Sequence, residues 1–144
     1  MEMRKRYKDF FEQLNSEFFN EKRFVPSVGP EDADVVFIGE APGANEVEEE
    51  EPFVGRAGER MNDILQDIDV ERNEIYITNL VKIRPPENRD PKKNEIEAWA
   101  PLLEKELENV DPDMIVTLGN FPSKHILDTD KGISQIHGRI FTRE

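Results

Sequence analysis

Short apolar runs alternate with longer amphipathic segments along this chain. Residues 35–38 form a continuous Val-Val-Phe-Ile run, which is typical of a buried parallel strand. Residues 73–82 predict a second strand that ends near Asn79, and residues 114–118 predict a third that stops at Gly119. Strands separated by helical segments predict an α/β fold, a three-layer α/β/α sandwich around a mostly parallel sheet. We expect residues 1–144 to form one domain.

Four segments carry apolar residues at the three- and four-residue spacing of an amphipathic helix. They are residues 1–21, the segment that begins at Gly58, residues 93–110, and a short stretch around residues 123–127. The second has Met61, Ile64, Leu65 and Ile68 on its apolar face, and in the third we expect Trp99 to fill the core. Residues 23–34 and the glutamate-rich residues 46–51 predict loops, and residues 133–144 predict a hairpin or an edge strand.

Composition limits the possible partners and chemistry. The chain has no cysteine, which excludes disulfides, thiol chemistry and any cysteine-bound metal or iron–sulfur cluster. Its two histidines give little material for a zinc site, so we expect no metal. A net charge of −13 argues against a nucleic-acid partner unless a local basic patch overrides it. No long apolar run or signal-peptide pattern occurs, which predicts a cytoplasmic protein with no membrane partner.

Candidate chemistry gathers where the predicted strands end. The first strand leads into Gly39-Glu40-Ala41-Pro42-Gly43, whose small residues let backbone N–H groups approach a ligand beside one carboxylate. Ligands of open α/β sheets bind outside the carboxyl ends of the strands, so this loop is the first candidate site. It also has the composition of a plain strand-to-helix connection. Asn79 ends the second strand, and the proline-rigid segment 83–91 after it carries two arginines and is flanked by Lys82, Lys92 and Lys93.

Several motifs occur in order between Ala33 and about Gly138. They are Gly-Glu-Ala-Pro-Gly at 39–43, Pro-Phe-Val-Gly at 52–55, Ala-Gly at 57–58, Ile-Thr-Asn at 77–79, Arg-Pro-Pro at 84–86, Asn-Arg-Asp-Pro at 88–91 and Leu-Gly at 118–119. Together they resemble the family 4 enzymes of the uracil-DNA glycosylase superfamily. The resemblance implies base excision repair: hydrolysis of the N-glycosidic bond of a flipped-out deoxyuridine, leaving an abasic site.

The residues suit the steps that such a reaction requires. Phe53 is expected to stack on the base, although it also fits an ordinary core position. The Asn79 amide matches uracil O4 and N3–H, a pattern that cytosine reverses, although an Asn here also fits a turn cap. Glu40 is the first candidate to stabilise the oxocarbenium-like sugar or to orient and deprotonate water. Ala41 and Pro42 are expected to line the uracil site, and backbone N–H groups of the Ala41 to Gly43 turn are expected to stabilise the departing base.

The resemblance adds further roles to this set. It implies that Glu46 lies against the uracil C5 edge, excluding the thymine methyl group or assisting with water. Asn88 is carried over as a residue that positions water or holds the loop. The basic segment is expected to contact DNA phosphates through Lys82, Arg84, Arg89 and Lys92, and its alternative is an exposed, solvated loop.

The sequence departs from the family pattern in two places. Family 4 enzymes hold a four-iron, four-sulfur cluster, but Ile83 and Trp99 stand where two of the cysteines are expected. We expect an apolar plug of these residues with Phe18, Phe19 and Phe24. The family's His-Pro-Ser or His-Pro-Ala motif is also missing before Glu144, and His137 lies too early to replace its histidine. Either the molecule is naturally shortened or a C-terminal strand follows.

Three functions remain open from the sequence. The first is a monofunctional, cofactor-free uracil-DNA glycosylase that acts as a monomer on uracil-containing DNA. The second is a non-catalytic relative that binds uracil-containing DNA or a partner protein, which the acidic charge and the missing motif favour. The third is a phosphate-binding α/β domain, which the lack of a Walker lysine after Gly43 disfavours.

Overall fold

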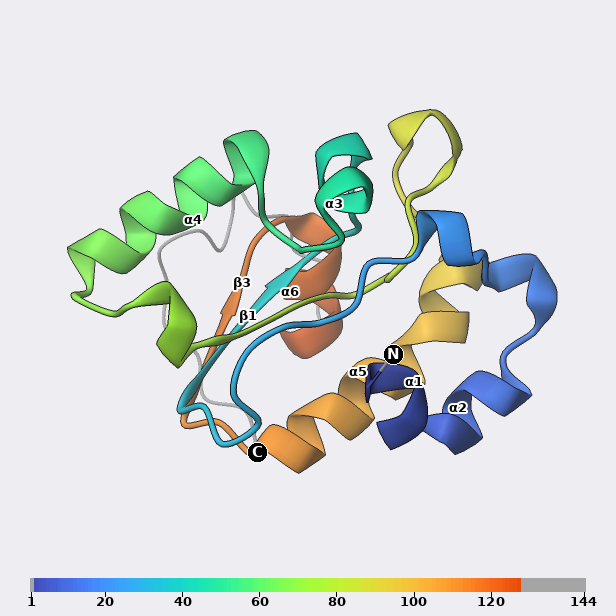
Figure 1. Ribbon diagram of the computed structural model, residues 1–144, viewed down its shortest axis with the longest axis horizontal. Helices are drawn as coiled ribbons and strands as arrows, with labels where there is room; N and C mark the ends of the chain where they lie inside the picture. Colours follow the sequence, from blue (N-terminus) through green and yellow to red (C-terminus); the bar gives the residue numbers. More distant parts are fainter. Residues whose placement is uncertain (1, 128–144) are drawn as a thin grey trace.

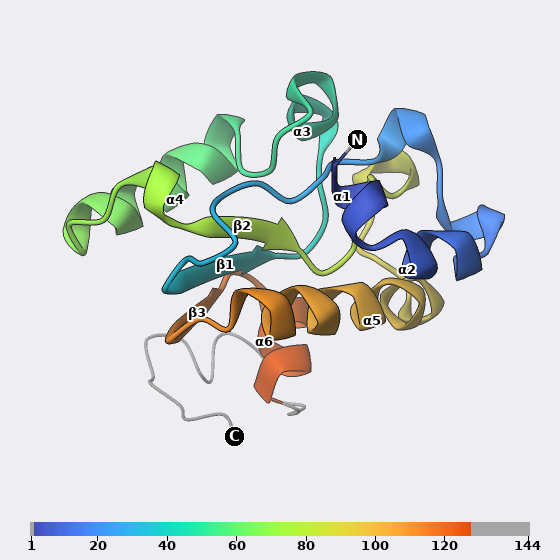
Figure 2. The same cartoon turned by 60° about the horizontal axis from the view of Figure 1, so that its bottom comes forward.

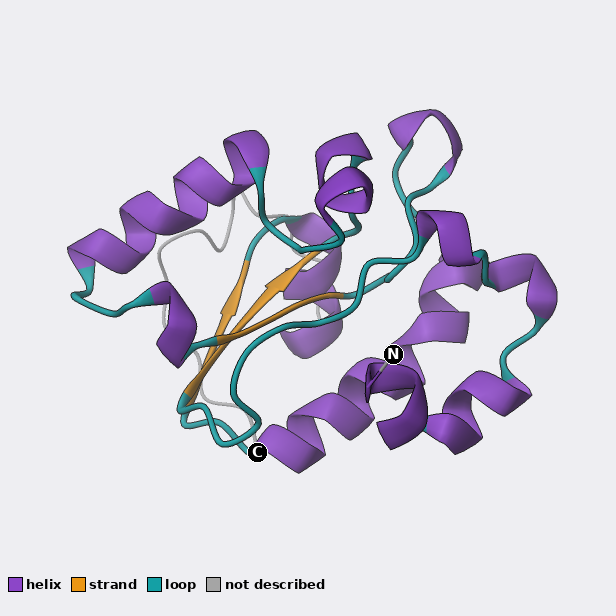
Figure 3. Cartoon of the chain, in the orientation of Figure 1, coloured by secondary structure: helices purple, strands orange, loops and turns teal. Residues whose placement is uncertain are grey.

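The computed structural model describes residues 2–127, which build a three-stranded sheet flanked by helices (Figure 1). The strands are β1 (Val35–Gly39), β2 (Tyr76–Asn79) and β3 (Met114–Thr117). Their order is β2-β1-β3, and both neighbouring pairs are parallel. The carboxyl ends of the three strands therefore lie at one end of the sheet, whose strands are orange in Figure 3. This arrangement confirms the predicted α/β sandwich with a parallel sheet.

Helices cover both faces of the sheet. The α-helices are α1 (Glu2–Arg6), α2 (Lys8–Gln13), α3 (Ala44–Glu49), α4 (Gly55–Asp67), α5 (Lys93–Val110) and α6 (Asn120–Leu127). Short 3-10 helices are η1 (Ser16–Phe18), η2 (Glu21–Arg23), η3 (Arg72–Glu74) and η4 (Pro86–Asn88). Figure 2 shows α3 and α4 on one side of the sheet and α5 and α6 on the other. No helix within residues 2–127 is long and apolar enough to cross a membrane.

The alternation of side chains along β1 explains this layering. Val36 and Ile38 point into the core shared with α5 and α6, whereas Phe37 between them packs in the core with Met61 and Leu65 of α4. All five side chains are buried. Because both faces of a central parallel strand are covered, its sequence is apolar throughout, which is why residues 35–38 were predictable as a buried strand.

The N-terminal region differs from its prediction. The helical pattern of residues 1–21 does not form one helix but two short helices followed by two 3-10 turns. Asn15 and Asn20 each accept a hydrogen bond from a backbone N–H two residues ahead, which starts a new turn at each point. Tyr7, Phe10, Phe11 and Phe19 of this region still pack in one core, because each turn redirects the chain around it.

Two further segments differ in detail. Residues 46–51 were predicted as a solvated loop, but α3 occupies most of this segment, and the Glu46 carboxylate accepts the Gly43 N–H at the start of that helix. Helix α4 begins at Gly55 rather than Gly58 and ends before Ile68, which is 46% exposed and so lies outside the predicted apolar face.

Strand β2 is shorter than the predicted residues 73–82, and the segment that contains Phe24 and Val28 covers its outer edge. The residue pair Val28 and Ile77 forms an antiparallel bridge, and Phe24 and Ile83 form another. The segment predicted as a loop at residues 23–34 therefore runs beside β2 and pairs with its outer edge. The predicted terminal hairpin of residues 133–144, together with His137, lies outside the described residues.

Candidate functional site

The predicted site residues follow strands that end side by side. Gly39 of β1 is paired in register with Asn79 of β2. Beyond that pair, the Leu80 N–H donates to the Gly39 carbonyl at 2.8 Å and the Val81 N–H donates to the Glu40 carbonyl at 3.0 Å. The chain segments that carry Glu40 and Asn79 are thus held together by backbone hydrogen bonds. As predicted, Glu40 and Asn79 lie at the same edge of the sheet.

Gly39 provides the space in which two of these residues meet. The Asn79 Oδ1 atom and the Phe53 Cζ atom both lie 2.5 Å from the position that a Cβ on residue 39 would occupy. Any side chain there would displace the amide, the ring or both. Asn79 is 5% exposed and Phe53 is 8% exposed, so each presents only a small surface at this edge. Phe53 also packs into the core beneath α4, as its alternative interpretation proposed.

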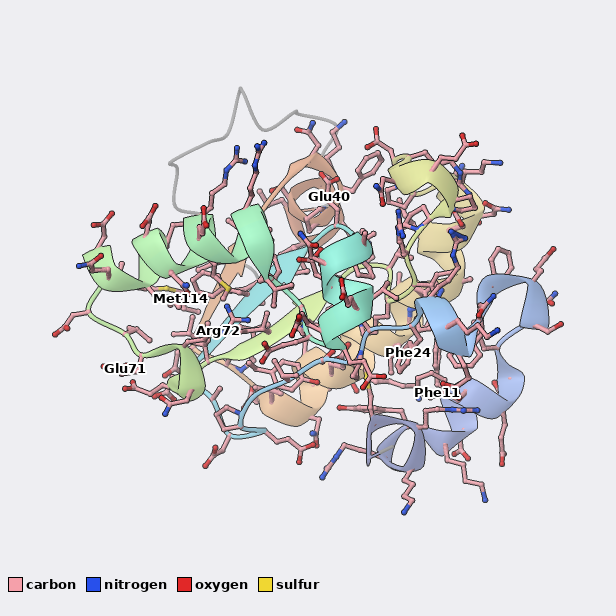
Figure 4. The ribbon with its side chains drawn as sticks, turned by 45° about the horizontal axis from the view of Figure 1, so that its top comes forward. Phe11, Phe24, Glu40, Glu71, Arg72 and Met114 are labelled. Atoms are coloured by element: carbon pink, nitrogen blue, oxygen red, sulfur yellow. The ribbon has the colours of Figure 1, made fainter. Side chains whose placement is uncertain are left out.

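Glu40 lies between β1 and the start of α6. Its Oε1 atom accepts the backbone N–H of Asn120 at 3.0 Å, and the carboxylate is half-buried (Figure 4). Gly119 has a φ of +110°, and a Cβ at that position would overlap the Glu40 side chain. Sequence analysis did not identify Gly119 or Asn120 as neighbours of Glu40, although the Leu-Gly pair after the third strand was visible.

Burial is the main cause of a raised pKa at Glu40. The neighbouring negative charge of Asp90 raises the pKa further, while hydrogen bonds from the backbone N–H groups of Asn120 and Phe121 oppose the rise. A carboxylate with a raised pKa is a stronger base once it is ionised. The site therefore contains a group suited to accepting a proton from water.

A cleft of about 140 Å³ opens beside Glu40. One wall is the loop of residues 40–43, and the other is formed by Pro85 and residues 88–91. The structure thereby brings Glu40, Ala41 and Pro42 opposite Asn88 and Arg89, which come from motifs more than forty residues later in the sequence. A larger depression of about 650 Å³ lies against α1 and α2, where basic and acidic side chains are mixed, and it includes none of the predicted site residues.

Glu46 holds two segments of the site together. One of its carboxylate oxygens accepts the Gly43 N–H at 2.9 Å, and the other accepts the Val54 N–H at 3.1 Å. The structure thus gives Glu46 contacts with backbone on both sides of α3. Within residues 41–43, Pro42 has no N–H and the Gly43 N–H is used by Glu46, which leaves the Ala41 N–H as the donor of this turn.

The predicted DNA-contacting residues fall into different environments. Arg84 donates from Nε to Asn88 Oδ1 at 2.7 Å, which supports the loop-holding role considered for Asn88. Arg89 makes two hydrogen bonds to the Glu95 carboxylate, at 2.7 and 3.2 Å, and this pairing raises the Arg89 pKa. Lys92 is exposed just before α5. Glu87 and Asn88 both have left-handed backbone conformations, with φ near +58° and +56°, which tighten the loop.

The prediction that Lys82 contacts DNA is wrong. Its side chain is completely buried, and its Nζ atom lies 2.7 Å from Glu106 Oε1 and donates to the Asn79 carbonyl at 2.7 Å. Burial lowers the Lys82 pKa, and the Glu106 carboxylate opposes that lowering. Charge alone suggested a surface lysine, but position 82 follows a buried strand whose side chains point inward.

Glu106 is the centre of a polar network that the sequence analysis missed. Its carboxylate also accepts from the hydroxyl groups of Tyr76 and Ser27, each at 2.5 Å, and from Thr78 Oγ1 at 3.3 Å. The sequence did contain a sign that Glu106 is buried. Position 106 lies three or four residues from the apolar Leu102, Leu103 and Val110, so on a helix it should face the core with them. The network lies beneath the end of β2 and secures the backbone of Asn79.

The positions that the family pattern assigns to cluster cysteines do not suit an iron–sulfur cluster. Trp99 and Ile83 lie with Phe24 in an apolar core, and the Phe24 and Trp99 rings stack with centroids 6.1 Å apart. The chain has no cysteine, and residues 2–127 contain no group of three acidic or histidine side chains arranged to hold a metal. The predicted apolar plug is present, with one change: Phe18 contributes its carbonyl, which accepts the Trp99 Nε1–H at 3.1 Å.

Comparison with known proteins identifies the family of this chain. The family described as the uracil DNA glycosylase superfamily matches residues 26–142. Type-4 uracil-DNA glycosylases from Archaeoglobus fulgidus, Sulfurisphaera tokodaii and Saccharolobus solfataricus are 42%, 40% and 40% identical to the chain. The alignments cover 84%, 81% and 84% of this chain but only 63%, 56% and 58% of the relatives. With the family match spanning most of its length, the chain belongs to the uracil DNA glycosylase superfamily.

Proposed function

We propose that this chain is a uracil-DNA glycosylase, which hydrolyses the bond between uracil and deoxyribose in DNA. The observation that carries the proposal is the cleft at the strand ends, in which the half-buried Glu40 faces Asn88 and Arg89. Next to it, Asn79 and Phe53 meet over Gly39. The type-4 names of the similar proteins support the same activity.

Recognition of the base is assigned to Asn79 and Phe53. In a flipped-out nucleotide, the Asn79 side-chain N–H would donate to uracil O4 and its carbonyl oxygen would accept the uracil N3–H. Cytosine presents a donor and an acceptor in the opposite places, so buried polar groups would remain unpaired, at a cost of about 1–3 kcal/mol each. The Phe53 ring supplies an apolar surface for the face of the base.

The chemical step is assigned to Glu40 and to the backbone beside it. Water attacks C1′ while the bond from C1′ to the base N1 breaks, and the bonding electrons leave with uracil. Glu40 stabilises the cationic sugar and takes the proton from water, and its raised pKa suits this role. The Ala41 N–H is the donor proposed for uracil O2, where negative charge develops.

The remaining predicted residues would act around this centre. Arg84, Arg89 and Lys92 are proposed to contact phosphates, while Asn88 holds Arg84 and lines the cleft. Glu46 is proposed to order the loop through its two backbone hydrogen bonds and to border the C5 edge of uracil. We also propose a cofactor-free, cytoplasmic, single-domain monomer, since a net charge of −13 makes copies of the chain repel each other.

The test is single-turnover cleavage of a uracil-containing oligonucleotide, with thymine-containing and cytosine-containing DNA as the control substrates. We expect abasic product from the wild-type chain, a loss of about 10²–10⁴-fold in Glu40→Gln, and a loss of discrimination against cytosine in Asn79→Ala. Absence of product at high enzyme concentration would overturn the proposal. Retained binding to uracil-containing DNA would then favour the non-catalytic relative.

A further inference from the structure

Phe53 adopts a backbone conformation that an aromatic residue rarely takes. Its φ is +56°, in the left-handed region, where a side chain with a Cβ is crowded. Such a conformation persists only where surrounding contacts enforce it, and it is common at functional sites. The contacts that enforce it here come from outside the segment itself.

Arg72 makes the most direct of these contacts. It is the first residue of η3, just before β2, and its Nη1 atom donates to the Phe53 carbonyl at 3.0 Å. Its Nη2 atom donates to the Pro52 carbonyl at 2.8 Å. Figure 4 shows Arg72 below α4, separated from Glu40. Arg72 therefore contacts the segment between α3 and α4 rather than the cleft.

The two carbonyl groups belong to the two peptide units on either side of the Phe53 Cα. The second of these units is held at its other end as well, because the Val54 N–H donates to Glu46 at 3.1 Å. Fixing both peptide planes fixes φ and ψ of Phe53, and with them the direction of its Cα–Cβ bond. Gly58 completes the arrangement, because a Cβ there would overlap the Phe53 carbonyl.

We propose that Arg72 is a positioning residue that sets the Phe53 ring for stacking on the base. This inference rests on the proposed glycosylase function and deepens it. The planar guanidinium presents two parallel donors at a fixed separation, which a lysine ammonium cannot reproduce. Glu51, at 4.0 Å from Nη2, partly balances its charge. Arg72 thus acts through Phe53 and does not contact the substrate.

The experiment compares Arg72→Ala, Arg72→Lys, Phe53→Ala and the double variant Arg72→Ala/Phe53→Ala in single-turnover cleavage of uracil-containing DNA. Lys105→Ala serves as the matched control, since it removes one positive charge from an exposed position of α5. We expect Arg72→Ala and Arg72→Lys to lower the rate roughly 10- to 100-fold, because a small misplacement of a positioning group has an effect of that order. Lys105→Ala should leave the rate unchanged.

Three readouts separate positioning from a merely structural role. Adding Arg72→Ala to Phe53→Ala should produce no further loss of rate, since the arginine acts through the ring. Guanidinium ion, at concentrations far below those that unfold the chain, should restore part of the rate of Arg72→Ala but not of Phe53→Ala. Binding to DNA with a base-free abasic analogue should be equal in the wild type and Arg72→Ala, because no base is present to stack.

Three results would overturn the inference, in two distinguishable ways. If the wild type cleaves uracil-containing DNA and Phe53→Ala slows it, an unchanged rate in Arg72→Ala, or fully additive losses in the double variant, removes the positioning role alone. If the wild type itself does not cleave, the proposed function fails and the role of Arg72 fails with it.

Discussion

The aromatic layer and the strand-end edge of this molecule are stabilised by different physical forces. The aromatic layer consists of Phe10, Phe11, Phe19, Phe24 and Trp99, whose ring centroids lie 5.4–6.3 Å apart in edge, tilted and stacked pairs. Figure 4 shows Phe11 and Phe24 of this layer beside the N-terminal helices, away from Glu40. Apolar packing has little directional preference, so many residues could fill this region.

The strand-end edge is the end of the sheet where Gly39 and Glu40 lie beside residues 79–81, and it depends instead on directed polar contacts. Glu106, Lys82 and Asn79 form a chain of hydrogen bonds beneath it, and Glu46 and Arg72 fix backbone above it. Each such contact needs a donor and an acceptor at one distance and angle. Different apolar residues can therefore fill the aromatic layer, whereas each polar residue of the edge is tied to the position of its partner.

The largest expected effect comes from breaking the buried pair beneath the edge. Lys82→Met should lower the free energy of unfolding by about 3–5 kcal/mol, because it leaves the Glu106 carboxylate buried without its positive partner. Urea denaturation measures this loss. The double variant Lys82→Met/Glu106→Gln should recover most of it, since no charge is then buried and the amide oxygen still accepts from Tyr76. A double variant as unstable as the single one would contradict this account.

A substitution in the aromatic layer should affect stability without affecting the site. Trp99→Phe removes part of a fully buried ring system and the hydrogen bond to the Phe18 carbonyl. We expect a loss of about 1–3 kcal/mol in the free energy of unfolding, below the 3–5 kcal/mol typical of complete truncation to alanine. The single-turnover rate, measured where both proteins are folded, should not change. A reduced rate at full folding would show that the two regions are coupled.

The pH dependence of cleavage tests the electrostatics of the edge. If ionised Glu40 is the base, kcat/KM rises with pH as this carboxyl loses its proton, and the raised pKa places that rise above the usual range for glutamate. Asp90→Asn removes a negative neighbour and should lower the Glu40 pKa, moving the rise to lower pH. A pH–rate profile of both proteins measures the shift. A shift to higher pH would contradict the assignment.

The smallest effect is expected at the exposed border of the aromatic layer. The Arg4 guanidinium lies 5.0 Å from the Phe19 ring centroid and 5.8 Å from that of Phe11, and it also pairs with Glu21. Arg4→Met keeps most of the apolar length and should lower the free energy of unfolding by only about 0.5–1 kcal/mol, because the pair is solvent-screened. Thermal denaturation in low and high salt measures it. A loss as large as that of Lys82→Met would refute the contrast between the regions.

Local sequence patterns determined much of this molecule. Side chains that face the core recur at a spacing that differs between strands and helices. This pattern predicted strands at residues 35–38 and 114–118 and a helix at residues 93–110, and all three elements are present in the structure. Gly39, Asn79 and Gly119 mark where the predicted strands stop, so the edge that carries the candidate site followed from the expectation of a parallel sheet. The motifs also predicted the family, because several weak signals in one order are jointly specific.

Only the tertiary structure decided which side chains contact each other. Lys82 and Glu106 are 24 positions apart, and a basic residue near a basic loop has the same sequence signature whether it is buried or exposed. Likewise, nothing local to Arg72 indicates that it binds the carbonyl groups of Pro52 and Phe53, which lie about twenty positions earlier. Periodicity records whether a position faces the core, whereas the pairing of polar groups depends on how distant segments pack.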